Sequence, residues 1–499
     1  MGENERRLAK TAARGAGGRG LSCLIFAALL PCLMAAGCSV NPATGKSQLA
    51  MMSEAQEIET GRQADQGVTQ ELGIYEDQRL QSYIQQLGSS LAAKSERPNL
   101  SWQFRVVDDP VVNAFALPGG YIYVTRGILA HLGSEAEVAG VLGHEIGHVT
   151  ARHSVEQMSR AQLAGIGLGV AMIVSEEFRQ YGALAQAGMG LLFLKFSRDD
   201  ERQADELGLR YLTRLSYDPN QMPNVFVTLG RVSAASGAGR IPNWLSTHPA
   251  PEDRTERLSQ QIAALPPEAR KGEVRRDSYL ERVNGLTFGT NPREGFFKDN
   301  VFYHPEMAFQ ITFPPGWKTV NEKQAVGALS PQQDAVVVLA PSAGKSPEEA
   351  AQAFFGSQSN VQRGSAIGQN FYGFRTVPAQ DASQQSAQPL QGIVGFLEHE
   401  GRILQLRGMA RADRWPGYET AVGQSLTTFK KLADPRYLSV QPRRVEIVRL
   451  PSAMSFEQFL SRYPSTVDAQ TVAIMNEVEP GAPLEAGRLV KRVTGAALP

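Results

Sequence analysis

The stretch His144-Glu145-Ile146-Gly147-His148 decides how the middle of this chain is interpreted. On an α-helix, His144 and His148 lie one turn apart on the same face, so both imidazoles can reach one metal ion. Glu145 lies beside that face, where its carboxylate can reach a water molecule at the metal without binding the metal itself. The spacing is typical of a zinc site with its general base. Such a short pattern also arises by chance, so the flanking sequence has to decide.

The flanking sequence predicts a helix at this position. Ser134, followed three residues later by Glu137, resembles a capping box that opens a helix running to about Arg152. Other expected elements are helical periodicity over residues 53–95 interrupted at Gly61, Gly67 and Gly73, strands at Trp102–Val107, Val111–Leu117 and Tyr121–Thr125, and helices at about Arg198–Leu215 and Glu252–Leu265. Two apolar segments, Leu163–Val174 and Ala183–Phe196, are shorter than a membrane span and predict buried or groove-lining helices rather than membrane insertion.

A second acidic motif offers the remaining metal ligand. A zinc hydrolase keeps three protein ligands and leaves the fourth position to water. Glu201 and Asp205 lie four residues apart on the predicted helix 198–215, and Glu201 follows His148 by 53 residues. One carboxylate can bind the metal while the other accepts a hydrogen bond from the free ring nitrogen of a ligand histidine. The alternative is an acidic face exposed to solvent.

Together, Gly143–His148 and the run from Ser197-Arg198 through Glu201 and Asp205 closely resemble the motifs of the HtpX-like and CAAX-prenyl-protease-like zinc metallopeptidases, family forty-eight of the metallopeptidases. The resemblance covers about Asn41 to Leu258 and is closest to the soluble periplasmic lipoprotein branch. It implies one Zn²⁺ per chain. The implied ligands are His144, His148 and Glu201, with Glu145 as general base and Asp205 hydrogen-bonded to a ligand histidine.

Two more segments resemble parts of the same family. Asn113-Ala114-Phe115-Ala116, before Leu117-Pro118-Gly119-Gly120, resembles the edge strand that pairs with an extended peptide substrate; a purely structural strand is compatible with this. Ser246-Thr247-His248-Pro249, with Arg254 beyond, resembles another family signature. His248 then either steadies the oxyanion or occupies the open zinc position, and a helix-capping role is the alternative. His131, His153, His304 and His399 have no partner at ligand spacing, so we expect surface or core positions for them.

The first 37 residues are predicted to be an export signal. Basic residues between Arg6 and Arg19 precede the apolar run Leu21–Met34, and Ala35-Ala36-Gly37 precedes Cys38. Small residues before a cysteine resemble a bacterial lipobox, which implies a lipid on Cys38; an ordinary secretory signal cut nearby is the alternative. Cys38 is the only cysteine after this segment, so no internal disulfide is expected. We expect a periplasmic, lipid-anchored protein, and Ser39 resembles an outer-membrane sorting signal.

The predicted fold class is α+β in several parts. A mainly helical gluzincin-type metallopeptidase domain with a small sheet is expected at 38–265, a linker at 266–298, an α+β domain at 299–435 and a small α/β module at 444–495. Phe309 to Trp317 resembles the opening of PsbP-like domains. The strand-helix-helix-strand order of 444–495 resembles a LysM module, which implies peptidoglycan contact; an unrelated small α/β cap is the alternative.

Charge and resemblance together limit the function. The chain has 50 Lys and Arg against 50 Asp and Glu with no basic block, which argues against a nucleic-acid partner. The resemblance implies a zinc-dependent endopeptidase of the bacterial cell envelope that hydrolyses unfolded or misassembled polypeptides. A chaperone or assembly scaffold with an idle or self-inhibited zinc site is the alternative.

Overall fold

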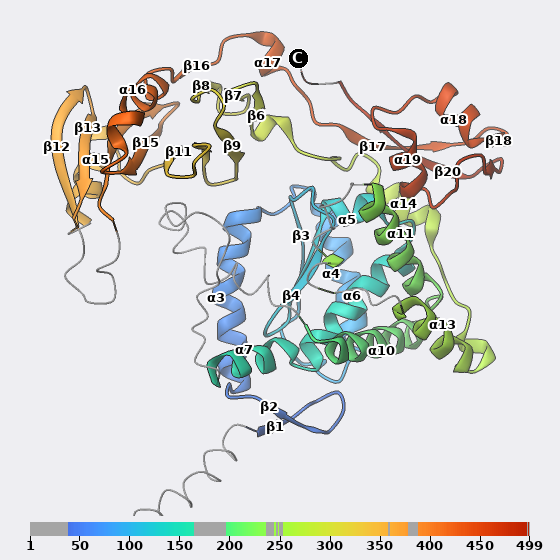
Figure 1. Cartoon of the computed structure of the whole chain (residues 1–499). Coiled ribbons are helices and arrows are strands. Elements are labelled where there is room, and N and C mark those ends of the chain that lie inside the picture. The colour runs from blue at the N-terminus through green and yellow to red at the C-terminus, as the bar shows by residue number, and fades with distance from the viewer. Residues whose placement is uncertain are drawn as a thin grey trace, which may run out of the picture.

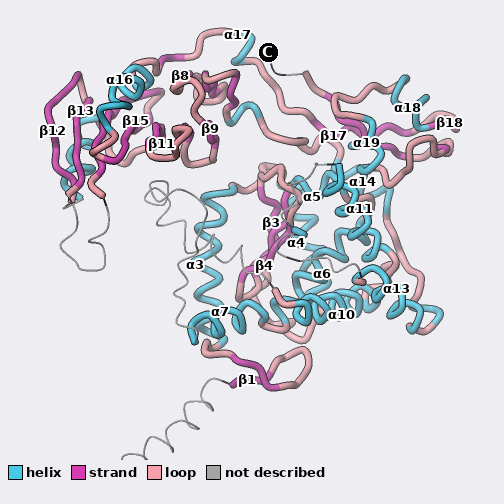
Figure 2. The backbone as a smooth tube through the Cα atoms, in the orientation of Figure 1, coloured by secondary structure: helices cyan, strands magenta, loops and turns pink. Residues whose placement is uncertain are grey.

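The computed structural model describes residues 38–163, 196–235, 244–245, 248, 253–357, 360–377, 388–496 and 498. In this part of the chain a mainly helical body is joined to regions built mainly of strands, an α+β arrangement (Figures 1 and 2). No helix among these residues is both long and apolar enough to span a membrane. The predicted export signal lies outside the described residues, and so do nearly all of the two apolar segments after Leu163.

The helical body contains a three-stranded sheet in the order β3-β5-β4. β3 (Gln103–Val107) runs parallel to β5 (Tyr121–Thr125), and β4 (Ala114–Leu117) pairs antiparallel with β5 at the edge. The helices of this body are α3 (Glu54–Leu72), α4 (Gln78–Ala92), α5 (Arg126–His131), α6 (Glu135–Thr150), α7 (His153–Leu163), α10 (Arg198–Arg214), α11 (Gln221–Ala235), α13 (Arg254–Ala264) and α14 (Arg276–Val283). A hairpin of β1 (Cys38–Val40) and β2 (Ser47–Leu49) precedes them.

Helix α6 carries the histidine motif and lies at the centre of this body. Its predicted capping box is present, because Ser134 and Glu137 each accept a hydrogen bond from the backbone N–H of the other. Every residue of α6 is buried, since α4, α10, α11 and β4 pack around it. Glycines let α10 come close: a Cβ at Gly147 would stand 3.0 Å from the Cα of Ala204. The backbones of α6 and α10 are therefore nearly in contact along the motif.

Helix α3 corrects one expectation from the sequence. Gly61 lies inside this continuous helix rather than interrupting it, and so does Gly67; only Gly73, with φ at +70°, ends it. The reason for a glycine at position 61 is packing, because a Cβ there would meet the carbonyl oxygen of Pro118 at 1.9 Å. Pro118 begins the turn that follows β4. Thus α3 is pressed against the edge hairpin of the sheet.

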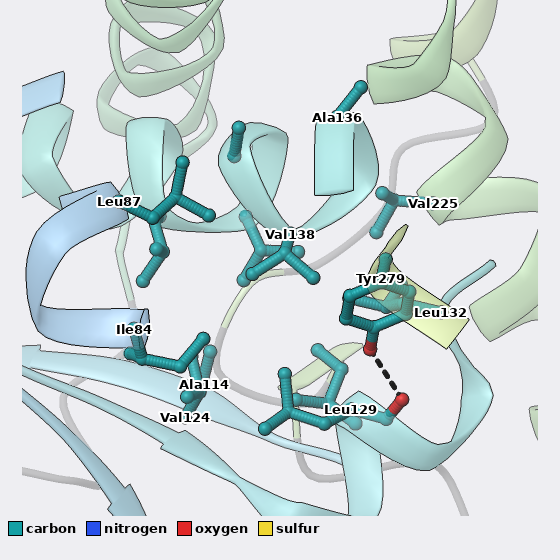
Figure 3. Packing of buried hydrophobic residues seen from close by; sticks show 14 of the residues in the cluster. Ile84, Leu87, Ala114, Val124, Leu129, Leu132, Ala136, Val138, Val225 and Tyr279 are labelled. Carbon is teal, nitrogen blue, oxygen red and sulfur yellow. Dashed lines mark hydrogen bonds between the residues drawn. The ribbon is translucent and has the colours of Figure 1, made fainter. Parts of the chain in front are cut away.

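The core of the helical body includes residues that lie outside the predicted domain range 38–265. Tyr279 lies on α14, in the stretch 266–298 that the sequence predicted to be a linker, and it is fully buried. Its hydroxyl donates to the carbonyl oxygen of Leu129 at 2.6 Å, beside Leu132 and Val138 (Figure 3). Part of the expected linker therefore belongs to the core, because an aromatic ring at position 279 fills space beside α5 and α6.

Residues 296–438 form the mainly β part of the chain. A seven-stranded sheet has the order β12-β13-β14-β15-β11-β10-β9, and a four-stranded sheet has the order β16-β8-β7-β6. Side chains alternate along β11, so Val336 and Val338 pack with α15 while Val337 and Leu339 pack with α16. The elements are β6 (Phe296–Lys298), β7 (Val301–His304), β8 (Phe309–Thr312), β9 (Lys318–Asn321), β10 (Val326–Leu329), β11 (Ala335–Pro341), α15 (Pro347–Ser357), β12 (Val361–Gly368), β13 (Phe371–Thr376), β14 (Leu390–His399), β15 (Arg402–Arg411), α16 (Trp415–Leu426), β16 (Lys430–Lys431) and α17 (Pro435–Leu438).

The C-terminal segment returns to the helical body (Figure 1). It consists of β17 (Arg444–Arg449), β18 (Met454–Ser455), α18 (Phe456–Arg462), α19 (Ala469–Met475), β19 (Pro483–Leu484) and β20 (Leu489–Thr494), with β17 antiparallel to β20. Val445, Met475 and Leu489 belong to the same hydrophobic cluster as α6. The buried ammonium of Lys491 donates to the carbonyl oxygens of Ala130 and Leu132, at 3.1 and 2.7 Å. The module is therefore fastened to the helical body beside the start of α6, and its LysM-like character stays a prediction.

A buried ion network fixes α3 to the end of α6. Glu57 on α3 is 1% exposed and accepts hydrogen bonds from Arg97 Nη1 at 2.7 Å and Arg152 Nε at 2.8 Å. Arg97 Nη1 also donates to the carbonyl oxygen of Val149, near the end of α6, at 2.9 Å. The backbone N–H of Gly119, in the turn after β4, donates to the same carboxylate at 3.3 Å. One carboxylate thus joins α3, α6 and the edge hairpin.

We expect Glu57→Ala to lower the free energy of unfolding by about 3–5 kcal/mol, because two buried guanidinium groups lose their shared buried carboxylate and Arg97 keeps only the exposed Glu54. Denaturant unfolding followed by circular dichroism measures this loss. The matched control is Glu59→Ala, two residues along α3, where an exposed carboxylate pairs with an exposed Arg62. The control should leave the unfolding midpoint nearly unchanged. Equal, small effects of both substitutions would contradict a stabilising role for the ion network around Glu57.

Candidate metal centre

The two motif histidines face one point inside the helical body. His144 and His148 lie one turn apart on α6, each 1% exposed, and their Nε2 atoms are 3.0 Å apart. Burial, and then the charge of His144, hold the pKa of His148 well below its usual value. A lowered pKa favours the neutral ring, which is the form of imidazole that binds a metal. Two bare nitrogens this close repel each other unless a cation lies between them.

Glu201 on α10 completes a triangle of donor atoms. Its two carboxylate oxygens lie 3.5 Å from His144 Nε2 and 3.5 Å from His148 Nε2. Ligand atoms placed 2.0–2.1 Å from a tetrahedral zinc ion are about 3.3 Å apart. The observed spacing fits such an ion. The close approach of α6 and α10 at Gly147 makes this possible, since Glu201 lies one turn from Ala204.

His248 joins the same cluster as a fourth donor. Its Nδ1 is 3.3 Å from His144 Nε2 and 2.9 Å from a Glu201 oxygen. The ligand atoms of His144, His148, Glu201 and His248 all lie within 4.8 Å of one another, and all four residues are buried. The structure therefore places His248 beside the metal position in this conformation. The neighbours Ser246, Thr247 and Pro249 of its motif lie outside the described residues.

Glu145, the predicted base, lies next to this cluster and is fully buried. One carboxylate oxygen accepts a hydrogen bond from Trp244 Nε1 at 3.1 Å and lies 3.7 Å from His248 Nε2. The other oxygen has no hydrogen-bond partner among the described residues. The indole of Trp244 also stacks on the ring of His248, with ring centroids 5.2 Å apart. Trp244 carries no sequence signal for this role, because nothing in its local pattern distinguishes it from a core tryptophan.

Asp205 supports His144 from behind. Its carboxylate lies 3.0 Å from His144 Nδ1, so that nitrogen carries the proton and Nε2 is free to bind a metal. Arg254 donates to both oxygens of Asp205, at 2.9 and 2.7 Å, and its Nη1 lies 2.9 Å from Glu201. Burial opposes ionisation, but the hydrogen bond from His144 and the charge of Arg254 lower the pKa of Asp205. Arg254 is thus a shared counter-ion for two buried carboxylates.

Of the other histidines, one lies beside the cluster of metal-binding side chains. His153, expected on the surface or in the core, has its Nδ1 3.0 Å from His148 Nδ1. Its position five residues after His148, just beyond the end of α6, was the available sequence signal. His131 is hydrogen-bonded to the Gly127 carbonyl oxygen and His399 to that of Met307, so neither joins the cluster. His304 accepts a hydrogen bond from the Met307 backbone.

The predicted substrate strand and lipidation site lie elsewhere on the body. Ala114, Phe115 and Ala116 form β4 at the edge of the sheet, whereas Asn113 precedes the strand. The backbone of Trp244 comes within 3.5 Å of the Val112 carbonyl oxygen, so the segment that carries His248 begins near the start of β4. Cys38 is the first residue of β1, and its side chain is outside what the structure describes.

Known proteins resemble this central part of the chain. Residues 78–262 match the model of peptidase family M48. The chain is 36% identical over 187 residues to the mitochondrial metalloendopeptidase OMA1 of Arabidopsis thaliana, which covers 38% of this chain and 37% of that protein. It is 31% identical over 223 residues to the beta-barrel assembly-enhancing protease of Yersinia pestis, covering 43% and 45%. The corresponding protein OMA1 of Schizosaccharomyces pombe is 31% identical over 229 residues, covering 44% and 65%.

The similarity is confined to part of each protein, since the chain spans less than two thirds of the length of these relatives. Among solved structures, cyanobacterial PsbP from Synechocystis aligns with 27% of this chain and 95% of its own, at 12% identity and a TM-score of 0.20. That score is too low to carry an argument, so the PsbP-like character of residues 299–435 stays a prediction.

The family match and the geometry agree on the same residues. The matched range contains all four members of the buried cluster, together with the predicted base Glu145 and with Asp205 and Arg254, which lie against the cluster. A buried set of histidine and carboxylate donors is the chemistry that a metallopeptidase requires. The part of this chain that matches peptidase family M48, residues 78–262, is therefore also the part that holds the buried cluster of metal-binding side chains.

Proposed function

We propose that this protein is a zinc-dependent endopeptidase. The observation that carries the proposal is the spacing of three buried donors, His144 Nε2, His148 Nε2 and the Glu201 carboxylate, at 3.0–3.5 Å from one another. Two imidazoles and a carboxylate are the ligand set of several hydrolytic zinc sites. A single zinc ion held there would supply a Lewis acid that activates water and polarises the scissile carbonyl.

Glu145 is the proposed general base and acid. Its carboxylate lies beside the cluster, is fully buried, and has one oxygen without a hydrogen-bond partner among the described residues. That oxygen can accept a proton from the attacking water and pass it to the leaving amine. Trp244 Nε1, which donates to the other oxygen, orients the carboxylate.

Strand β4 is the proposed substrate platform. It pairs with β5 on one side only, and among the described strands none pairs with its other side. An extended peptide can add to such an edge through main-chain hydrogen bonds, with little demand on its sequence. This mode of binding suits unfolded chains, in which the backbone is free to pair.

The proposed location is the bacterial cell envelope. The predicted lipobox at Cys38 supports a lipid anchor, and the residue Ser39 supports the outer membrane. The similarity to a beta-barrel assembly-enhancing protease supports a role in quality control of unfolded or misassembled envelope proteins. The LysM-like order of residues 444–495 supports contact with peptidoglycan, which a pull-down of the full chain with purified sacculi would test.

A second candidate function is that of a chaperone or assembly scaffold whose zinc site is self-inhibited. The observation that favours it is His248, which lies 2.9 Å from Glu201 and 3.7 Å from Glu145, where a substrate carbonyl would have to approach. In this conformation the base and the ligand cluster are both covered. A gain of cleavage activity when the His248 ring is removed would distinguish an inhibited enzyme from an idle one.

Glu145→Gln should abolish cleavage of an unfolded protein while zinc remains bound, because the base is lost and all three ligands are kept. We expect a rate loss of about 10²-fold or more, measured by digestion of unfolded casein alongside zinc analysis. The matched control is Glu206→Gln on the exposed face of α10, which should be fully active. Undiminished cleavage by the Glu145 variant would remove the enzyme assignment. Complementation of a deletion strain by that variant would instead support the scaffold.

His248→Ala should raise the rate of casein cleavage several-fold, because the ring no longer covers Glu145 and Glu201. Three protein ligands remain, so zinc analysis should still find one ion per chain. A slower variant that keeps its zinc would show that His248 stabilises the oxyanion instead. Comparing the rates with wild type at equal zinc content makes the two outcomes distinct.

A further inference from the structure

A chain of side chains runs from the N-terminal hairpin to the metal ligand His148. We infer that Asn41, Gln203 and His153 are positioning residues, which fix the tautomer and orientation of His148 so that its Nε2 is free for a metal. The inference rests on the proposed metal site. It assigns a role to the turn between β1 and β2, 107 residues before His148 in the sequence.

Backbone groups fix the orientation of Asn41. Its Oδ1 accepts from the backbone N–H groups of Ala43 and Thr44, at 2.9 and 3.3 Å, and its Nδ2 donates to the carbonyl oxygen of Ala151 at 3.2 Å. A backbone N–H can only donate and a carbonyl oxygen can only accept, so the amide cannot be reversed without losing all three bonds. Asn41 is 6% exposed, so water does not replace them readily.

The orientation of Asn41 determines that of Gln203. Asn41 Nδ2 is also 3.2 Å from the side-chain amide of Gln203, and because Nδ2 only donates, the facing atom must be the oxygen Oε1. The same oxygen is 2.9 Å from His153 Nε2. Since Oε1 only accepts, His153 must carry its proton on Nε2.

The tautomer of His153 determines that of His148. A neutral imidazole with its proton on Nε2 has a bare Nδ1, and His153 Nδ1 is 3.0 Å from His148 Nδ1. His148 must then donate from Nδ1, which leaves its Nε2 bare and facing His144 and Glu201. The same conclusion follows from the metal, because a histidine bound through Nε2 keeps its proton on Nδ1 and requires an acceptor there. The assignments made from the two ends of the chain agree.

The two ligand histidines are therefore supported differently. His144 donates to the carboxylate of Asp205, which Arg254 holds on both oxygens. His148 donates to another imidazole, and beyond that ring lie the amides of Gln203 and Asn41 and, 3.7 Å from His153 Nε2, a carboxylate oxygen of Asp200. Asn41 lies three residues after Cys38, so the hairpin that would follow a lipid anchor also completes the surroundings of the metal. Undocking the hairpin should weaken metal binding.

The test measures zinc affinity by competition with a chromogenic chelator, using the full mature chain. Asn41→Asp keeps the acceptor for Ala43 and Thr44 but loses the donor, while Gln203→Leu and His153→Leu interrupt the later links. We expect each to weaken zinc binding about 10- to 100-fold, and to change the visible spectrum of the Co²⁺-loaded protein. Gln203→Glu keeps an acceptor facing His153 and should retain more affinity than Gln203→Leu.

The matched control is Ser159→Ala. Ser159 Oγ accepts from the backbone N–H of Met51 at 3.0 Å and so holds the end of the hairpin to α7 without touching the chain of side chains. The Ser159→Ala variant should bind zinc with the affinity of the wild type. Thermal melting of the metal-free proteins shows whether each variant is folded, and only folded variants are compared.

Wild-type affinity and an unchanged Co²⁺ spectrum in folded Asn41→Asp and His153→Leu would overturn the inference. An equal loss in Ser159→Ala would also overturn it, because general loosening of the hairpin would then be the cause. Failure of the proposed function has a different signature: wild type itself would bind no zinc, or would bind it without cleaving unfolded protein.

Discussion

The close approach of α6 and α10 is the constraint on which the rest of the structure depends. Two helices with ordinary side chains between them lie about 8–10 Å apart, and small residues at the contact let their backbones come closer. Here Gly143 and Gly147 face Gly208 and Ala204, and the backbones nearly meet. Glu201 then lies 3.5 Å from both imidazoles. The glycine within His144-Glu145-Ile146-Gly147-His148 thus allows the close helix contact beside which the metal-binding side chains meet.

Placing the site on a fully buried helix has an electrostatic consequence. Buried carboxylates are costly unless they are paired, and each one near the cluster has a partner. Arg254 pairs with Glu201 and Asp205. Trp244 and His248 lie beside Glu145, and Arg97 and Arg152 pair with Glu57 at the C-terminal end of α6. The ends of the helix are held as well, by the hairpin around Asn41 and by Lys491 from the C-terminal segment. These contacts keep the histidines rigid, which a metal site requires.

Local sequence was a good guide wherever the signal was local. The capping box at Ser134, the strand at Tyr121–Thr125 and the helix at 198–214 all follow from patterns within a few residues, and the structure confirms them. The predicted interruption of the helix at Gly61 was wrong. A glycine is needed there because the carbonyl oxygen of Pro118, on a turn distant in the sequence, leaves no room for a Cβ. The predicted linker at 266–298 was wrong in part for a similar reason. The charged, glycine-containing stretch gives no local sign that Tyr279 packs into the core of the helical body.

By itself, the sequence determined the chemistry: two histidines and a glutamate at helical spacing, and an acidic pair at the same spacing further along. These follow from the pitch of one helix, which puts residues four apart on one face. Only the tertiary structure decided which further side chains meet them. Trp244 donates to Glu145, and Asn41 donates to the carbonyl oxygen of Ala151 just beyond the end of α6; no pattern within their own segments encodes these contacts. Contacts between segments a hundred residues apart depend on packing, and packing depends on the whole chain.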